Sequence, residues 1–282
     1  MKNLEILVAA TLARPVAPEI GAMADHVRGL HNGVVAVLAY GSCLRGIATA
    51  DSLIDLYVLT ADFSGVSPNS LSRMGCALAP PNVYYAELDI AGHRLRAKYA
   101  VMPLPLFAEW MTAPNPYFWA RFAQPSALLF STDDRTATAI AQAVCTMYGH
   151  ALGLSADDEP LAVWAKGFAA TYGTELRAEA SANRAASLVA ANENYYRTAA
   201  ALMPGVTPVK ANWAARRMTG KLWSLARLIK AAFTFVGGAD YLAWKIERHS
   251  GHRIELTDWQ RRHPVIAGLT LLPKLLKRGA VR

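Results

Sequence analysis

The 282-residue chain has few cysteines, and none of them is paired in sequence. Cys43, Cys76 and Cys145 are widely separated and form no CxxC pair. This spacing argues against a zinc site and against a disulfide framework, because both need clustered cysteines. The seven histidines show no metal-ligand spacing such as HxxxH. We therefore expect a reducing compartment, with the histidines on the surface or in the core.

Long apolar runs are also missing. The chain has no uncharged apolar stretch of about 18 to 20 residues, the length that a membrane-spanning helix needs. Apolar residues nevertheless make up 53% of the chain, which excludes intrinsic disorder. The first residues carry an early acid, Glu5, and are not followed by a secretory h-region and cleavage site. We expect a protein that is not secreted and is either soluble or peripheral to a membrane.

Negative charge is scarce at one end of the chain. Residues 210–282 hold 15 Lys and Arg against 4 Asp and Glu, whereas the whole chain has a net charge of +8. The other residues are therefore slightly acidic in sum. An excess of positive charge confined to one segment predicts a polyanionic partner, either a nucleic acid or an anionic lipid surface.

Four short apolar runs have the pattern of strands. They are residues 34–40, 54–59, 83–91 and 94–102. The first run ends at Gly41-Ser42, and the second contains a single acid, Asp55. The last two flank Gly92-His93, which predicts a hairpin.

The remaining chain is mostly helical in pattern. Residues 19–31 have apolar positions at helical spacing, and residues 136–203 read as alanine-rich helices before a Pro- and Gly-containing linker at 203–208. We predict an α/β (α+β) fold in three parts. These are a mixed-sheet domain over 1–135, a mainly helical module over 136–207, for which a winged helix is one option, and a basic amphipathic, membrane-associating segment over 208–282.

The basic segment begins with an amphipathic helix. Its apolar stripe is Met218, Leu222, Leu225, Ile229 and Phe233, and its other positions include Arg216, Arg217, Lys221, Arg227 and Lys230. Residues 264–282 are also rich in leucine and end with basic residues. Two interpretations remain open. The stripe packs on the body of the protein, or it lies in the acyl boundary of a membrane with its cations near anionic head groups.

A strand that ends at Gly41-Ser42, followed by a strand that carries Asp55, resembles the sequence pattern of the nucleotidyltransferase fold. Glycine lets backbone amides approach triphosphate oxygens, and the serine hydroxyl adds a donor. Carboxylates on the neighbouring strand hold Mg²⁺ against the same phosphates. Two acids usually alternate on that strand, but here the first position is Leu53. Asp55 is still expected to be functional, because a buried carboxylate without a cation or donors is costly.

Further motifs follow in order along the chain. They are Tyr40-Gly41-Ser42, Leu53-Ile54-Asp55-Leu56, Val83-Tyr84-Tyr85, Arg94-Leu95, Lys98-Tyr99, Arg121 and Pro125. In order and spacing they resemble the mitochondrial-type phosphatidate cytidylyltransferases, also called translocator maintenance proteins, and the chain looks like a bacterial member. That family typically has a single acid in an "IDF" or "LDF" strand. Residues 172–177 look like its "YxGDxR" segment, with Glu175 in place of the acid. The resemblance covers roughly residues 34–235.

The resemblance implies a reaction and a set of residue roles. CMP would pass from CTP to phosphatidic acid, giving CDP-diacylglycerol and pyrophosphate, with Mg²⁺ or alternatively Mn²⁺. Asp55, Lys98 and Glu175 would be catalytic, and Asp55 and Glu175 would bind the metal. Tyr40, Gly41, Ser42 and Arg121 would hold the nucleotide, and Glu87 or Asp89 could replace the missing acid.

The implied partners are CTP, phosphatidic acid and an anionic membrane surface bound by residues 208–282, with no nucleic acid. The implied location is peripheral, on the cytoplasmic face of the inner membrane. Two other functions stay open. One is a soluble nucleotidyltransferase acting on a small molecule or on RNA. The other is a non-catalytic binding module of the same fold, which the leucine at position 53 favours.

Overall fold

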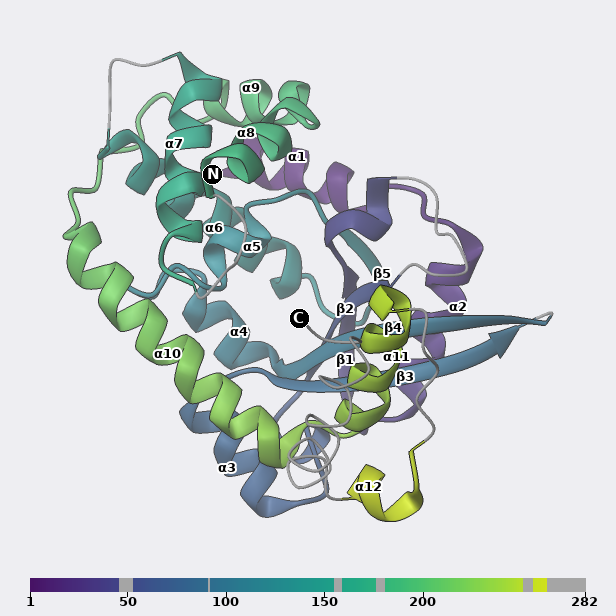
Figure 1. Cartoon of the computed structure of the whole chain (residues 1–282). Helices are drawn as coiled ribbons and strands as arrows, with labels where there is room; N and C mark the ends of the chain where they lie inside the picture. The colour runs from purple at the N-terminus through teal and green to yellow at the C-terminus, as the bar shows by residue number, and fades with distance from the viewer. Residues whose placement is uncertain (46–52, 91, 155–158, 176–180, 251–255, 263–282) are drawn as a thin grey trace.

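A computed structural model of the chain describes residues 1–45, 53–90, 92–154, 159–175, 181–250 and 256–262. Five strands form one sheet in the order β3-β4-β2-β1-β5 (Figure 1). The strands are β1 (Val34–Ala39), β2 (Leu53–Thr60), β3 (Asn82–Ile90), β4 (His93–Pro103) and β5 (Ala127–Ser131). β2 and β4 run parallel, and the other neighbours are antiparallel. The predicted mixed sheet is confirmed, with all four predicted strands in place.

Helices precede the sheet, connect its strands and follow it along the chain. In the first half of the chain they are α1 (Lys2–Leu12), α2 (Pro18–Gly29), η1 (Gly41–Arg45), η2 (Phe63–Gly65), α3 (Ser70–Leu78), α4 (Leu104–Trp110) and α5 (Trp119–Phe122). In the second half they are α6 (Arg135–Leu152), α7 (Pro160–Tyr172), α8 (Ser181–Ala190), α9 (Glu193–Ala201), α10 (Trp213–Thr234), α11 (Gly238–Ser250) and α12 (Asp258–Arg262). The predicted α/β part followed by a mainly helical region is confirmed.

Different helices pack on the two faces of the sheet. α2 packs against one face, and α4 packs against β2 and β4 on the other. Side chains alternate between the faces along a strand, so Asp55 shares a face with Tyr57, which contacts Phe107 of α4. Lys98 and Tyr85, the register partners in the same row as Asp55, lie on that face too. Asp55 therefore points away from α2 and toward the helical region.

The helical region shares a core with the sheet. α6 packs against α1, α4, α5 and α7, and buried residues of all these helices belong to one hydrophobic cluster with the strands. Trp119 of α5 and Trp164 of α7 are both fully buried in it. This shared core fixes α7 and α8 relative to the strands that carry Asp55.

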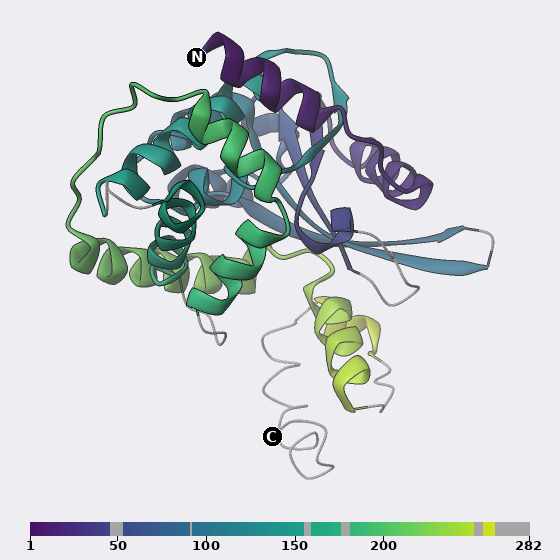
Figure 2. The same ribbon diagram turned by 90° about the horizontal axis from the view of Figure 1, so that it is seen from above.

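α10 runs along the side of the molecule, from the helical region to α3 (Figures 1 and 2). At its start, a Cβ on Gly220 would come within 2.5 Å of the Thr174 carbonyl oxygen, so the helix touches the segment after α7. At its end, Lys230 Nζ donates to the carbonyl oxygens of Ala79 and Pro81. α10 therefore braces the helical region and the sheet domain together.

The side of α10 that packs on the body carries Arg216, Arg227 and Lys230. Arg217 and Lys221 are exposed, as is the apolar stripe. Arg227 donates to the Pro80 carbonyl oxygen and lies 3.7 Å from the centre of the Tyr117 ring. The apolar stripe defined above is 47% to 82% exposed at every position. The interpretation in which the stripe packs on the body is therefore wrong. Burial of the cations is tolerated because carbonyl oxygens and aromatic faces accept them.

None of the described helices is long and apolar enough to cross a bilayer. Residues 264–282, the second predicted amphipathic segment, lie outside the described residues, as do Leu176 and Arg177 of the "YxGDxR"-like segment.

Candidate functional site

Asp55 lies on β2, next to the turn that follows β1. The antiparallel pairing of β1 and β2 brings the Tyr40 N–H to 3.2 Å from the Asp55 carbonyl oxygen. Gly41 follows with a φ of +83°, a conformation that favours glycine. A Cβ at Gly41 would lie 3.5 Å from Asp55 Oδ2, so the carboxylate borders this turn directly. The glycine and the acid predicted to act together are thus neighbours.

Three cations surround the Asp55 carboxylate. Lys98 is its register partner on β4, Arg121 comes from α5, and Arg184 comes from α8. Burial raises the pKa of Asp55 above its ordinary value, and the positive charges of these three residues counteract part of that rise. Positive charge from these three side chains near Asp55 favours a ligand that brings negative charge.

Arg121 links several of the predicted residues. Its Nη1 donates to the Tyr40 hydroxyl at 3.3 Å, and its guanidinium lies 4.7 Å from the centre of the Tyr117 ring. The negative charge of Glu175 acts on Arg121 and also on Arg227. The fold therefore brings Glu175, three residues after α7, within electrostatic reach of Arg121, whose charge also acts on Asp55.

A polar cavity of about 340 Å³ adjoins this group. Its walls come from the sheet domain through Gly41 and Gln124, and from the helical region through Tyr172, Asn183, Arg184 and Ser187. Arg184 is exposed, and its guanidinium lies 5.7 Å from the centre of the Tyr172 ring. The volume is within the range of about 300 to 1,000 Å³ usual for small-molecule sites. The cavity therefore places a ligand-sized space between Gly41 and Arg184.

Sequence reasoning missed Arg184, Gln124 and Asn183. Nothing in their local sequence distinguishes them from solvated surface residues, because α8 is an ordinary alanine-rich helix. They become site residues only through the packing of α7 and α8 over the Gly41 turn. Ser42, which was predicted, follows Gly41 at the start of η1 and is exposed.

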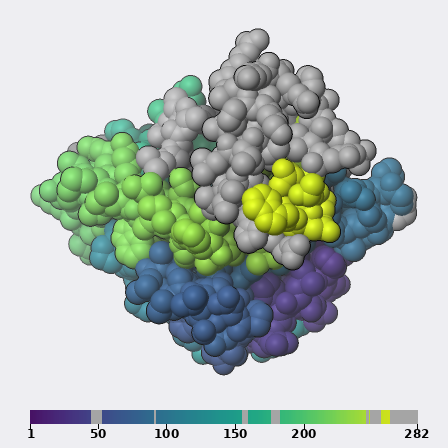
Figure 3. Space-filling model, turned by 60° about the horizontal axis from the view of Figure 1, so that its bottom comes forward, coloured from purple at the N-terminus to yellow at the C-terminus, as the bar shows by residue number. Residues whose placement is uncertain are grey.

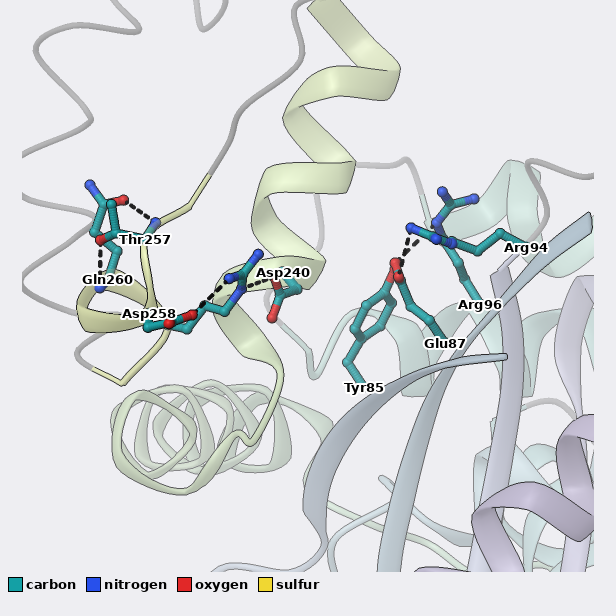
Figure 4. Close-up of polar contacts among 9 residues, drawn as sticks. Tyr85, Glu87, Arg94, Arg96, Asp240, Thr257, Asp258 and Gln260 are labelled. Atoms are coloured by element: carbon teal, nitrogen blue, oxygen red, sulfur yellow. Dashed lines mark hydrogen bonds and ion pairs between the residues drawn. The ribbon is translucent and has the colours of Figure 1, made fainter. Parts of the chain in front are cut away.

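The two alternative acids lie farther along the sheet. Glu87 is in the row of Leu53 and Arg96, two strands away from β2, so about 10 Å separates it from that strand. It accepts a hydrogen bond from the Tyr85 hydroxyl at 2.8 Å and pairs with Arg94 and Arg96 (Figure 4). Asp89 pairs with Arg94 near the end of the hairpin and is exposed. Both acids are engaged by arginines, and the structure does not bring them to Asp55.

The chemistry of the site decides whether the implied Mg²⁺ fits. Protein-bound Mg²⁺ often uses one or two carboxylates together with water and substrate phosphates. Among the described residues, no group of three His, Cys, Asp or Glu is arranged to hold a metal. Asp55 offers one carboxylate beside the cavity, and the surrounding cations repel a bare divalent ion. The residues fit a Mg²⁺ that enters with nucleotide phosphates and takes Asp55 as its protein ligand.

Comparisons with known proteins find distant similarities among solved structures and none among family models or curated sequences. Among solved structures, the chain is similar to a nucleotidyltransferase-like protein from Exiguobacterium sibiricum 255-15, at 12% sequence identity and a TM-score of 0.29. The alignment covers 93% of this chain and 92% of that chain. The similarity is too low to support assigning a function, so the assignment has to rest on the geometry around Asp55.

Proposed function

We propose that the protein is a metal-dependent nucleotidyltransferase that transfers CMP from CTP to phosphatidic acid. The observation that carries the proposal is the Asp55 carboxylate, bordered by Gly41 and faced by Lys98, Arg121 and Arg184 beside a polar cavity. This combination suits a triphosphate with a metal ion, because the cations balance phosphate charge and the carboxylate holds the metal. The choice of CTP and phosphatidic acid follows the resemblance of the motifs.

The triphosphate would lie along the Gly41 turn. A backbone at positive φ without a Cβ allows phosphate oxygens to approach its amides, and the Ser42 hydroxyl is exposed beside it. Arg184 and Arg121 would bind phosphate oxygens from the sides of the helical region and of α5. Mg²⁺ bound to Asp55 would neutralise phosphate charge during the reaction.

The reaction needs little acid–base help from the protein. A phosphate oxygen of phosphatidic acid forms a bond to the α-phosphorus of CTP, and the bond from that phosphorus to the bridging oxygen of the β-phosphate breaks, releasing pyrophosphate. A phosphomonoester has a second pKa of about 6, so the attacking oxygen is largely ionised near pH 7. Catalysis would then consist of positioning and charge stabilisation, to which Lys98, the register partner of Asp55, would contribute a positive charge.

A lipid acceptor agrees with the surface of α10. Its exposed apolar stripe carries five large side chains. Figure 3 shows α10 beside α3 at the surface of the molecule. Contiguous exposed apolar surface usually marks a protein or membrane contact. Peripheral attachment through this stripe, with the basic residues of 208–282 near anionic head groups, would bring the site to its substrate.

The test is turnover of CTP labelled at the α-phosphate, with phosphatidic acid in mixed micelles and Mg²⁺. Wild-type protein should form labelled CDP-diacylglycerol, and Asp55→Ala should form none. Absence of product with wild-type protein that still binds CTP and metal would reject the lipid acceptor.

Two alternatives give different results in the same set of experiments. A soluble nucleotidyltransferase would bind CTP but would leave vesicles in high salt, because a purely electrostatic contact is screened. A non-catalytic module would show no metal-dependent CTP binding at all.

A further inference from the structure

A second cavity, of about 450 Å³, lies between α10, α11 and the strands β3 and β4. Its walls are almost entirely apolar and include Leu228 and Ala232 of α10 and Phe235 just after that helix. Tyr241 and Leu242 of α11 form the opposite side. The proposed nucleotide site does not use this cavity.

Lys98 connects the inner side of this cavity with Asp55, the proposed catalytic residue. Lys98 is the charged residue of the lining, and it is also the register partner of Asp55. Its ammonium lies 5.8 Å from the centre of the Tyr241 ring. Tyr241 is itself close enough to Asp55 for the carboxylate charge to contribute to raising the pKa of Tyr241, after the larger effect of burial. The apolar cavity therefore borders Asp55 from the side opposite to the Gly41 turn.

The outer side of the cavity opens at exposed apolar residues. Leu228 and Leu242, which line it, are 65% and 50% exposed. Leu228 is adjacent on α10 to Ile229 of the exposed stripe, and Val236, just after the helix, is also exposed. Apolar side chains therefore extend from the exposed stripe into the cavity, and Lys98 lies at the inner end of this apolar surface.

We infer that this cavity binds an acyl chain of the lipid acceptor, with the lipid phosphate at Lys98. The inference rests on the proposed function and extends it to the position of the acceptor. An apolar cavity with one ammonium group in its lining complements a molecule with one anionic end and one hydrocarbon end. The Lys98 end places that phosphate next to Asp55, and the stripe end faces the surface from which a membrane lipid would enter.

Chain-length dependence with monomeric acceptors tests this directly. Dibutanoyl and dihexanoyl phosphatidic acid are used below their micellar concentrations, because the hydrocarbon then leaves water when it enters the cavity. Each methylene buried adds about 0.8 kcal/mol, a factor of about four. If one chain enters, kcat/KM for the dihexanoyl acceptor should exceed that for the dibutanoyl acceptor by roughly tenfold.

A variant whose cavity is filled by a large side chain should lose the preference for the longer acyl chain. Ala232→Trp places an indole in the cavity, and Ala214→Trp is its matched control, on an exposed position at the start of the same helix. Ala232→Trp should reduce the ratio between the two acceptors to near one and leave the KM for CTP unchanged, whereas the control should behave as wild type. Ala232→Leu, a smaller filling, repeats the test if the tryptophan variant does not fold.

Binding of cis-parinaric acid, a fluorescent fatty acid, separates this inference from the proposed function. If wild type binds the probe, Ala232→Trp does not, and no cytidylyl transfer occurs, the apolar site stands and the proposed function fails. If transfer occurs with equal kcat/KM for both acceptors and Ala232→Trp changes neither kcat/KM nor probe binding, the acyl site is rejected and the proposed function stands.

Discussion

Asp55 of β2 and Lys98 of β4 are register partners in the parallel pair at the centre of the sheet. The aspartate borders the Gly41 turn and the polar cavity on one side. The lysine lines the apolar cavity on the other side. A nucleotide and an apolar acceptor could therefore meet at this one pair of residues.

The ionised carboxylate of Asp55 should lower the free energy of unfolding of the ligand-free protein. Burial raises its pKa, so the folded state binds the proton more tightly than the unfolded chain does. The resulting stability is present below the unfolded pKa and is lost as the pH rises through the folded pKa. Asp55→Asn should therefore unfold at a temperature a few degrees higher than wild type near pH 7, and by about the same temperature near pH 3. A lower midpoint for the variant at pH 7 would show instead that the ionised group stabilises the fold.

Arg184 should contribute to nucleotide binding. It is exposed at the rim of the polar cavity, and hydrogen bonds to charged groups contribute about 1.5 to 3 kcal/mol. Arg184→Ala should therefore raise the KM for CTP by about tenfold to a hundredfold. Arg135→Ala, an exposed arginine at the start of α6, is the control. Equal KM values for the two variants would remove Arg184 from the nucleotide site.

The apolar stripe of α10 should hold the protein on vesicles. Leu222 and Ile229 are 60% and 56% exposed, and burying each in the acyl boundary would contribute about 1.5 to 3 kcal/mol. The double variant Leu222→Glu, Ile229→Glu should lose co-sedimentation with vesicles containing phosphatidic acid, even at low salt. The control, Ile6→Glu with Leu30→Glu, changes exposed apolar residues of the α1 and α2 region. Vesicle binding that survives in the α10 variant would contradict insertion of this stripe.

His150 should make the fold sensitive to acid. It stacks on Trp119 with ring centres 5.1 Å apart, and Arg216 Nη1 lies 3.2 Å from its Nδ1. Burial and then the Arg216 charge lower the pKa of His150 to about 4. The unfolded chain thus binds the proton more tightly, and stability should fall by up to about 3 kcal/mol as the pH drops from about 6.5 to 4. His150→Phe keeps a ring against Trp119, so urea unfolding across this range should show a smaller loss. Parallel curves for the two proteins would assign the acid sensitivity to other groups.

Four of the five strands, β1 to β4, were predictable because each is a short apolar run bounded by turn residues. β5 was missed, since residues 127–131 follow a proline-rich stretch whose local pattern resembles a helical segment more than a strand. Its place at the sheet edge comes from pairing with β1, which no local signal reports. No local signal predicted the parallel pairing of β2 with β4 either. This pairing places Asp55 beside Lys98.

The orientation of α10 shows the limit of the amphipathic pattern. Periodicity correctly separated the apolar stripe from the basic positions, but it does not say which face meets the protein. The body offers carbonyl oxygens at residues 79–81 and the Tyr117 ring, which accept Lys230 and Arg227. These acceptors come from distant segments, so only the folded chain reveals that Arg227 and Lys230 face inward. The roles of Asp55, Glu175 and the magnesium ion stay predictions.

The most direct measurement of the central claim follows both products of one reaction. Wild-type protein, CTP labelled at the α-phosphate, phosphatidic acid and Mg²⁺ are mixed, and labelled CDP-diacylglycerol and released pyrophosphate are quantified together. The account predicts equal amounts of the two products with wild type and neither with Asp55→Asn, although that variant is folded. Equal turnover by wild type and Asp55→Asn would contradict the assignment of Asp55 as the group on which transfer depends.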